Sequence, residues 1–197
     1  TLAAVGDEWM AAWQHAPAFG DAGEPVVRGR RFRGSVAIDT ADGDLTWPGT
    51  FAPALTATAA GGFALAFETL GAGVDVAARR IPADDAEGIA WSATSAAWTV
   101  ASASADERLA GIAAAGDGAG IAVAYVVGLA AVPGIAFDGA VAGPELDALM
   151  TAWASDSVQS LTLAPARRGV MVLWSSRNDA LRGIATRGVA SMYVGVE

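Results

Sequence analysis

Histidine is the residue most often used for general acid–base catalysis, and the sequence contains a single one, His15. The chain has no cysteine, and all 12 of its basic residues are arginine. Without thiolates or lysine it has no cysteine nucleophile, disulfide, Schiff base or P-loop, and one imidazole cannot build a multi-histidine metal site. We interpret His15 as the end of an amphipathic helix, where a cation meets the favourable end of the helix dipole. The sequence therefore predicts no catalytic residue, no metal and no organic cofactor.

Arginine supplies the sharpest local feature, because a third of all basic residues fall within six positions of one predicted strand. Successive side chains of a strand point to opposite faces, so Arg28 and Arg30 share one face while Arg31 and Arg33 share the other. The planar guanidinium suits a carboxylate or a phosphate. We therefore expect these four residues at a contact with a partner subunit, with a plain solvated strand and a small-anion site as alternatives.

Three acids, Asp39, Asp42 and Asp44, lie close together around a predicted Asp-Gly hairpin turn. Carboxylates gathered at a turn are typical ligands of calcium. The spacing does not match an EF-hand loop, because the glycine follows the second acid and no glutamate closes the loop. We interpret the acids as polar decoration of the turn, and calcium is the one metal that the pattern permits.

The low share of charged residues predicts that part of the protein surface is buried against another protein chain. Hydrophobic residues make up 53% of the 197 residues and charged residues only 17%, against about 25% in an average domain. So few charges leave little polar material for the surface, and we expect part of the apolar surface to lie against another protein. The net charge of −9, with both halves acidic, argues against a nucleic-acid partner.

Two long uncharged stretches, 45–67 and 118–137, could be mistaken for membrane spans. Proline and glycine interrupt both, and acids rather than basic residues flank the second. We interpret both as buried strands and expect no membrane span. The absence of a basic segment followed by an apolar one at the start predicts no signal peptide, and together with the absence of cysteine it favours a cytoplasmic location.

Periodicity predicts one domain over 1–197 with an α+β fold. We expect a β-rich, mostly antiparallel sheet, barrel or sandwich with about four helices. An N-terminal amphipathic helix over 1–16 precedes a β-rich part over 25–103 and a mixed part over 104–197. The first helix follows from apolar residues at steps of three and four, with Trp9 and Trp13 as packing anchors. A second follows from Ser104 as a cap before Asp106 and Glu107. The four predicted helices lie near 2–16, 104–115, 144–155 and 179–187.

Strands are predicted from alternation of large and small residues and from turn signals. We expect at least six of them. The segment 63–67 is typical of a strand with one buried face, and the residues 165–169 predict a hairpin turn. The predicted strands are 26–39, 45–47, 63–67, 74–76, a run after Ile89 that carries Trp91 and Trp98, 121–127, 135–141, 158–163, 170–174 and 189–196.

These observations favour a non-enzymatic structural or assembly protein, a subunit of a larger homo- or hetero-oligomer such as a particle shell, a virion tail or a secretion apparatus. The alternative is a small-molecule protein with an apolar cavity that binds a ligand or uses aspartate and arginine without histidine. A regulatory binding module is the third possibility. The partners predicted are other protein subunits, and no nucleic acid.

Overall fold

The fold consists of strands joined by turns wherever the chain is described. The computed structural model describes residues 1–15, 23–39, 45–59, 61–81, 96–102, 105–115, 120–128, 132–138, 157–167, 169–177 and 187–195. These residues form fifteen strands, and the described part of the chain contains no helix.

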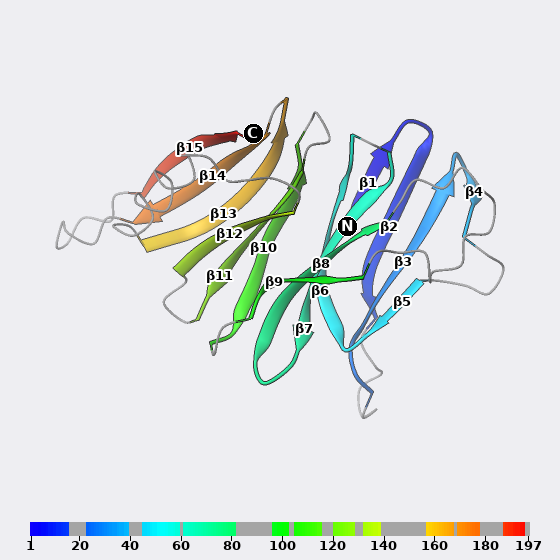
Figure 1. Ribbon diagram of the computed structural model, residues 1–197, viewed down its shortest axis with the longest axis horizontal. Helices are drawn as coiled ribbons and strands as arrows, with labels where there is room; N and C mark the ends of the chain where they lie inside the picture. Colours follow the sequence, from blue (N-terminus) through cyan, green and yellow to red (C-terminus); the bar gives the residue numbers. More distant parts are fainter. Residues whose placement is uncertain are drawn as a thin grey trace.

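The strands form four sheets that follow one another in chain order (Figure 1). Sheet 1 contains β1 (Leu2–Val5), β2 (Glu8–His15), β3 (Val26–Arg33), β4 (Val36–Ala37) and β5 (Leu45–Pro48). Sheet 2 contains β6 (Thr50–Ala57), β7 (Phe63–Leu70), β8 (Val74–Ile81) and β9 (Trp98–Ala101). Sheet 3 contains β10 (Glu107–Ala114), β11 (Ile121–Val127) and β12 (Val132–Asp138). Sheet 4 contains β13 (Ser157–Ala166), β14 (Gly169–Arg177) and β15 (Arg187–Gly195).

Within each sheet the strands run antiparallel, and nearly all pair with their sequence neighbours. Tight turns make this possible. β1 and β2 are joined through Gly6 and Asp7, with Gly6 at φ 62°. Glycine with positive φ at the first of two turn residues matches the right-handed twist of the two strands. β3 and β4 use the same device, with Gly34 at φ 56°.

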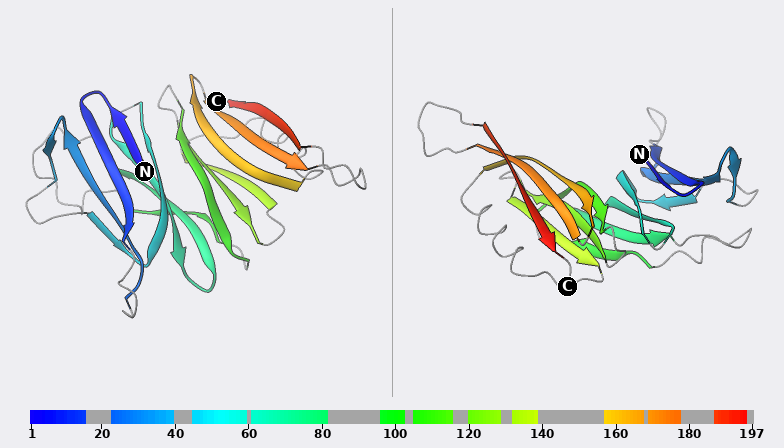
Figure 2. Two further views of the ribbon diagram at one scale, coloured as in Figure 1. Left: turned by 180° about the vertical axis from the view of Figure 1, so that it is seen from behind. Right: turned by 90° about the horizontal axis from the view of Figure 1, so that it is seen from above.

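Three hydrophobic clusters alternate with the four sheets and hold them together. Seen from above (Figure 2), sheet 1 lies at one end of the long axis and sheet 4 at the other. Cluster 1/2 joins Met10, Ala12, Val27, Leu45 and Trp47 of sheet 1 to Leu55, Phe63, Leu65, Phe67 and Ile81 of sheet 2. Cluster 2/3 joins Ala64, Ala66, Val76 and Ala78 of sheet 2 to Ile121 and Val123 of sheet 3. Cluster 3/4 joins Ala113, Ala122, Ala124 and Ile135 of sheet 3 to Leu161, Val170, Val172 and Trp174 of sheet 4.

The central strands of sheets 2 and 3 are therefore buried on both faces. In β7 the residues from Phe63 to Glu68 are all buried, and in β11 those from Ile121 to Ala124 are. Alternation of large residues and alanine, which predicted a single buried face, instead fills two different clusters. Large side chains point toward the preceding sheet and alanines toward the following one. Alanine permits close approach of the next sheet, because it projects only a methyl group.

The predicted α+β class and its N-terminal amphipathic helix are wrong. Residues 2–5 and 8–15 form a hairpin instead of a helix, and His15 ends a strand opposite Val26. Trp9 and Trp13 share a face, as predicted, but a step of four residues also keeps two side chains on one face of a strand. Periodicity over so short a segment could not separate the two structures.

The helix predicted over 104–115 is also wrong, since 107–114 form β10. The acids that favoured a helix start have other partners. The Asp106 carboxylate accepts a hydrogen bond from the Val74 amide of sheet 2, and Glu107 is fully buried. The helix predicted over 144–155 lies outside the described residues, as does that over 179–187 except for Arg187, which begins β15.

The strand predicted over 26–39 is wrong in its extent, because the chain turns at Gly34 and forms two antiparallel strands, β3 and β4. Most of the other strand predictions are confirmed in the described residues. The strand predicted over 121–127 is β11, and the hairpin around 165–169 joins β13 and β14. Well over six strands are present, all paired antiparallel.

Candidate protein-binding face on sheet 1

The four arginines of β3 have two different environments. Arg31 points into the molecule, where its Nε and Nη2 each lie 2.8 Å from Asp39 Oδ1. The Arg31 amide also donates to Asp39 Oδ2, at 2.5 Å. The two side chains are only 4% and 1% exposed. Arg31 therefore finds its carboxylate eight residues further along its own chain.

Arg33 likewise has a carboxylate within the chain. Its Nη2 lies 2.6 Å from Glu8 Oε1, across the ladder that pairs the two residues. The Arg33 side chain is 45% exposed. Such exposed pairs contribute about 0–1 kcal/mol. Arg31 and Arg33 thus contact carboxylates within sheet 1. Alternation along β3 places Arg28 and Arg30 on the opposite, outer face.

Arg28 and Arg30 lie beside aromatic rings. The ladder places Trp13 opposite Arg28 and Phe32 opposite Trp9. The rings of Trp9 and Phe32 stack, with centroids 4.0 Å apart and planes 8° from parallel. Directly paired residues of antiparallel strands project to the same face. We name this surface the outer face of sheet 1 and define it by Trp9, Trp13, Arg28, Arg30 and Phe32.

On the inner face of β3, close packing around Gly29 fixes the position of the strand that carries Arg28 and Arg30. At Gly29, between the two arginines, a Cβ atom would lie 2.6 Å from Met10 Cε and 3.4 Å from the Trp47 ring. Glycine therefore allows both side chains to pack across the strand. On the outer face the Trp9 indole donates to the Gly34 carbonyl at 2.7 Å, which ties the stacked rings to the β3–β4 turn.

The outer face of sheet 1 belongs to none of the three clusters. Its five residues are half-buried. The tryptophans were interpreted from the sequence as anchors of a helix. Had 8–15 been taken as a strand, their even spacing would have placed them on one face.

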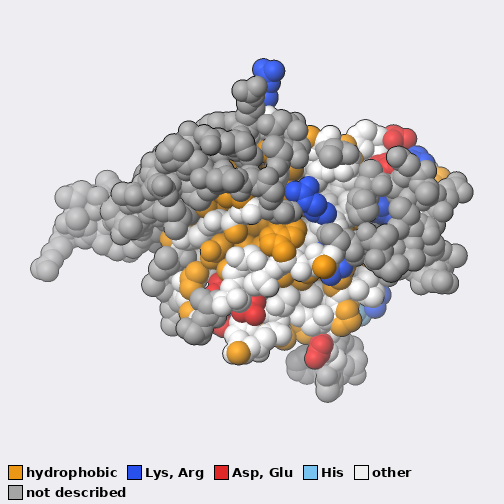
Figure 3. Space-filling model, viewed as in Figure 1, with side chains coloured by type: hydrophobic (Ala, Val, Ile, Leu, Met, Phe, Trp, Pro, Cys, Tyr) orange, Lys and Arg blue, Asp and Glu red, His pale blue; other side chains and the backbone are white. Residues whose placement is uncertain are grey.

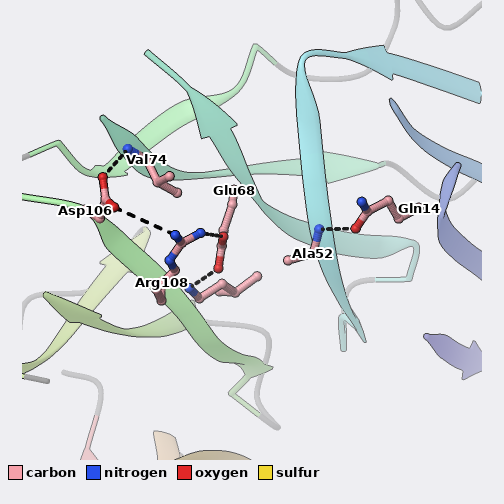
Figure 4. A network of polar contacts seen from close by, with 7 residues as sticks. Gln14, Ala52, Glu68, Val74, Asp106 and Arg108 are labelled. Atoms are coloured by element: carbon pink, nitrogen blue, oxygen red, sulfur yellow. Dashed lines mark hydrogen bonds and ion pairs between the residues drawn. The ribbon is translucent and has the colours of Figure 1, made fainter. Parts of the chain in front are cut away.

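A second polar group lies between sheets 2 and 3 (Figure 4). Glu68 of β7 is buried and accepts two hydrogen bonds of 2.9 Å, from Arg108 Nη1 and from the Leu109 amide. Asp106 Oδ2 lies 3.8 Å from Arg108 Nη2. A half-open pocket of about 360 Å³ is lined by Ala105, Asp106, Arg108 and Gly128. Glu68 and Asp106 both contact Arg108. We therefore interpret these three residues as a polar contact that stabilises the packing of sheet 2 against sheet 3.

In two places, shown in Figure 4, a side chain of one sheet accepts a hydrogen bond from a backbone amide at a β-bulge of the next sheet. The ladder of β10 shifts register between Leu109 and Gly111, and that of β6 between Phe51 and Ala54. Each β-bulge leaves an amide outside the ladder. Glu68 of sheet 2 accepts from the Leu109 amide, and Gln14 of sheet 1 accepts from the Ala52 amide at 3.2 Å.

Burial shifts the pKa of two side chains, Tyr125 and Arg79. Burial raises the pKa of Tyr125, and the nearby Glu107 carboxylate adds to the rise. Burial lowers the pKa of Arg79, whose guanidinium carbon lies 5.6 Å from the Trp47 ring centroid and 6.0 Å from that of Phe67. The Arg79 side chain thus packs against two aromatic rings of cluster 1/2.

Hydrophobic side chains also gather in the middle of the face seen in Figure 3, over β10 and its neighbours. Six partly buried hydrophobic residues pack against cluster 2/3: Trp98, Val100, Ala101, Leu109, Ile112 and Tyr125. The patch therefore lies at the rim of a contact between two sheets of the same chain.

Metal ligands do not gather in the described part of the chain, where no group of three His, Asp or Glu side chains could hold an ion. Of the acids considered for calcium, Asp39 binds Arg31, and Asp42 and Asp44 lie outside the described residues. No helix among the described residues is long and apolar enough to cross a membrane.

The described part of the chain is a series of stacked antiparallel sheets with an aromatic and arginine-bearing outer face on sheet 1. Comparison of the chain with protein-family models, with curated proteins and with solved structures finds no match.

Proposed function

We propose that this chain is a non-enzymatic structural subunit of a larger protein assembly, and that it contacts its partner through the outer face of sheet 1. The observation that carries the proposal is the gathering of Trp9, Trp13 and Phe32 with two arginines on one face of a sheet. Aromatic residues and arginine are the types enriched in protein interfaces, and tryptophan and arginine supply most of the residues that dominate binding energy.

The rest of the chain supports this proposal. The single histidine lies exposed at the end of β2. The net charge of −9 means that acidic groups are plentiful on any second copy. Particle shells, virion tails and secretion apparatus are assemblies of this kind, and we place the chain in the cytoplasm or in a particle formed there.

The test compares the association of the chain with that of the double variant Trp13→Ala/Arg30→Ser. Light scattering over a concentration series should show the parent well above the 19.7 kDa of one chain, and the variant shifted toward the single chain. Arg167→Ser removes the same charge from the exposed β13–β14 turn and should leave association unchanged. Association of the parent should weaken with salt, and that of the variant should be less salt-sensitive.

A parent chain that is monomeric at every concentration would contradict the proposal. The alternative of a small-molecule protein would then lead, and the pocket beside Asp106 and Arg108 would be the place to look for a ligand. Unchanged association of the double variant, with its fold intact by circular dichroism, would equally contradict a role for the outer face of sheet 1.

A further inference from the structure

The half-open pocket at the start of β10 has one acidic and one basic side chain in its wall. Its volume is about 360 Å³, and it is lined by Ala105, Asp106, Arg108 and Gly128. Ligand sites in proteins range from about 300 to 1,000 Å³, so this pocket has room for a small molecule only. The Asp106 side chain is 56% exposed and the Arg108 side chain 50% exposed, so a ligand from solution can reach both.

Both charged side chains are held in place by only part of their hydrogen-bonding groups. Asp106 Oδ1 accepts from the Val74 amide at 3.1 Å, and the Asp106 carbonyl accepts from the Gly128 amide at 2.8 Å. Arg108 Nη1 donates to Glu68 Oε2 at 2.9 Å, so that Figure 4 shows the guanidinium between Glu68 and Asp106. A carboxylate has a second oxygen and a guanidinium has further N–H groups. Asp106 Oδ2 and Arg108 Nη2 are therefore positioned by the fold and can each bind a ligand group.

The distance between these two atoms leaves a place for a ligand. Asp106 Oδ2 lies 3.8 Å from Arg108 Nη2. A charge-assisted hydrogen bond between nitrogen and oxygen is about 2.7–2.9 Å long, so the two atoms attract each other without forming one. An ion pair this exposed contributes little. A ligand that gives Oδ2 a donor and Nη2 an acceptor replaces this weak contact with two short hydrogen bonds.

The charges of the group select the class of ligand. Glu68 and Asp106 are acidic and Arg108 is basic, which leaves one negative charge in excess around the pocket. A simple anion on Nη2 would meet that excess, and a simple cation on Oδ2 would meet the guanidinium 3.8 Å away. A small molecule with an ammonium group and a carboxylate on neighbouring carbon atoms satisfies both atoms and adds no net charge. An α-amino acid has this arrangement.

The rest of the wall leaves space for such a molecule. Gly128 has φ 63°, and a Cβ there would lie 3.7 Å from the Ala105 Cβ. Glycine and alanine thus lie next to each other, and this side of the pocket presents backbone and a single methyl group. The α-carbon of an amino acid and a small side chain can lie against it.

We propose that this pocket binds a free α-amino acid, with the ammonium group on Asp106 Oδ2 and the carboxylate on Arg108 Nη2. The pocket lies at the end of sheet 3 where β10 begins and β11 ends. This ligand site goes beyond the proposed function and does not depend on the outer face of sheet 1.

The test is a titration of the ¹⁵N-labelled chain followed by the chemical shifts of the Asp106 and Gly128 amides. L-alanine should cause saturable shifts at both. Propionate lacks the ammonium group and ethylammonium lacks the carboxylate, so each should bind about tenfold more weakly or less, because each loses one charge-assisted hydrogen bond.

Two variants locate the ligand. Asp106→Asn keeps an acceptor oxygen for the Val74 amide but loses the charge, and it should weaken binding of L-alanine about tenfold or more. Asp7→Asn makes the same change at the exposed β1–β2 turn and should leave binding unchanged. Ala105→Leu enlarges an exposed side chain of the wall and should abolish binding. The amide spectrum of each variant without ligand shows whether its fold is intact.

Four outcomes would overturn the inference. The first is the absence of saturable shifts with L-alanine. In the second, propionate binds as tightly as L-alanine and Asp106→Asn binds it more tightly, which defines an anion site. In the third, ethylammonium binds as tightly as L-alanine, which defines a cation site. In the fourth, Asp106→Asn and Ala105→Leu bind L-alanine like the parent, which places the ligand elsewhere. None of these outcomes bears on the association of chains, so the proposed function is tested separately.

Discussion

Arg31 and Asp39 form an ion pair in which neither side chain is more than 4% exposed. The pair closes the hairpin of β3 and β4, where the Ile38 amide also donates to the Arg31 carbonyl at 3.1 Å. A buried charge is costly unless it is paired and hydrogen-bonded. Both Asp39 oxygens accept bonds from Arg31, from the guanidinium and from the backbone amide. Arg31 is therefore a structural residue of sheet 1 and is unavailable to a partner.

Asp39→Ala should destabilise the protein by about 3–5 kcal/mol, because it leaves the Arg31 guanidinium buried and uncompensated. The free energy of unfolding from denaturant titration measures this. Glu8→Ala breaks the more exposed pair with Arg33 and should cost about 0–1 kcal/mol. Equal effects of the two changes would show that burial does not distinguish the pairs.

Gly134→Ala should cost about 1–3 kcal/mol by overpacking. A Cβ at Gly134 would lie 2.5 Å from Tyr125 Cε2 and 2.7 Å from its hydroxyl oxygen, so the ring must leave its place on the facing strand. Gly111→Ala is the matched control in the same sheet, since its Cβ would meet nothing closer than the Leu163 amide nitrogen at 3.9 Å. Thermal denaturation should show a clear loss for the first change and little for the second. A loss of equal size in both would assign the effect to backbone rather than to Tyr125.

Glu68→Ala should cost about 1–3 kcal/mol, because it leaves the Leu109 amide at the β10 bulge without its acceptor in a partly buried place. Gln14→Ala removes the same kind of contact from the Ala52 amide at an exposed place, where water can replace it, and should cost a few tenths of a kcal/mol. Glu68→Gln keeps an acceptor oxygen and should lie between the two. Denaturant titration of the three variants gives the order, and a reversed order would refute the role of burial.

Tyr125 should ionise above its ordinary pKa of 10.0, because burial and then the Glu107 carboxylate both disfavour the phenolate. Ultraviolet titration of the phenolate should show a late transition that Tyr125→Phe removes. Glu107→Gln should lower the pKa of Tyr125 only in part, since burial is the larger cause.

The same shift links stability to pH. A pKa raised by folding stabilises the folded state fully below the unfolded pKa of about 10, and the contribution is lost as the pH rises through the folded pKa. Above pH 10 the parent should therefore lose stability more steeply than Tyr125→Phe. Parallel curves for the two proteins would contradict the shift.

The sequence by itself determined the strands whose pattern is unmistakable. Alternation over 63–67 predicted β7, and the uncharged stretch 118–137, interrupted by glycine and proline, predicted β11. The turn at 165–169 predicted the β13–β14 hairpin. Composition by itself removed cysteine, lysine and multi-histidine chemistry. These conclusions hold because they depend on local spacing or on residue type alone.

Tertiary structure decided what local spacing leaves open. A four-residue step fits a helix face and a strand face alike, so only the pairing of β2 with β3 shows that Trp9 and Trp13 stand beside Arg28 and Arg30. Alternation of large and small residues shows that the two faces of a strand differ, but it does not show whether another sheet packs on both of them. The sequence predicted one buried face for 63–67, and the alanines of β7 are buried as well because sheet 3 packs on them. Arg31 meets Asp39 because β4 folds back onto β3 and brings Asp39 beside it. The spacing of residues in the sequence does not reveal this contact.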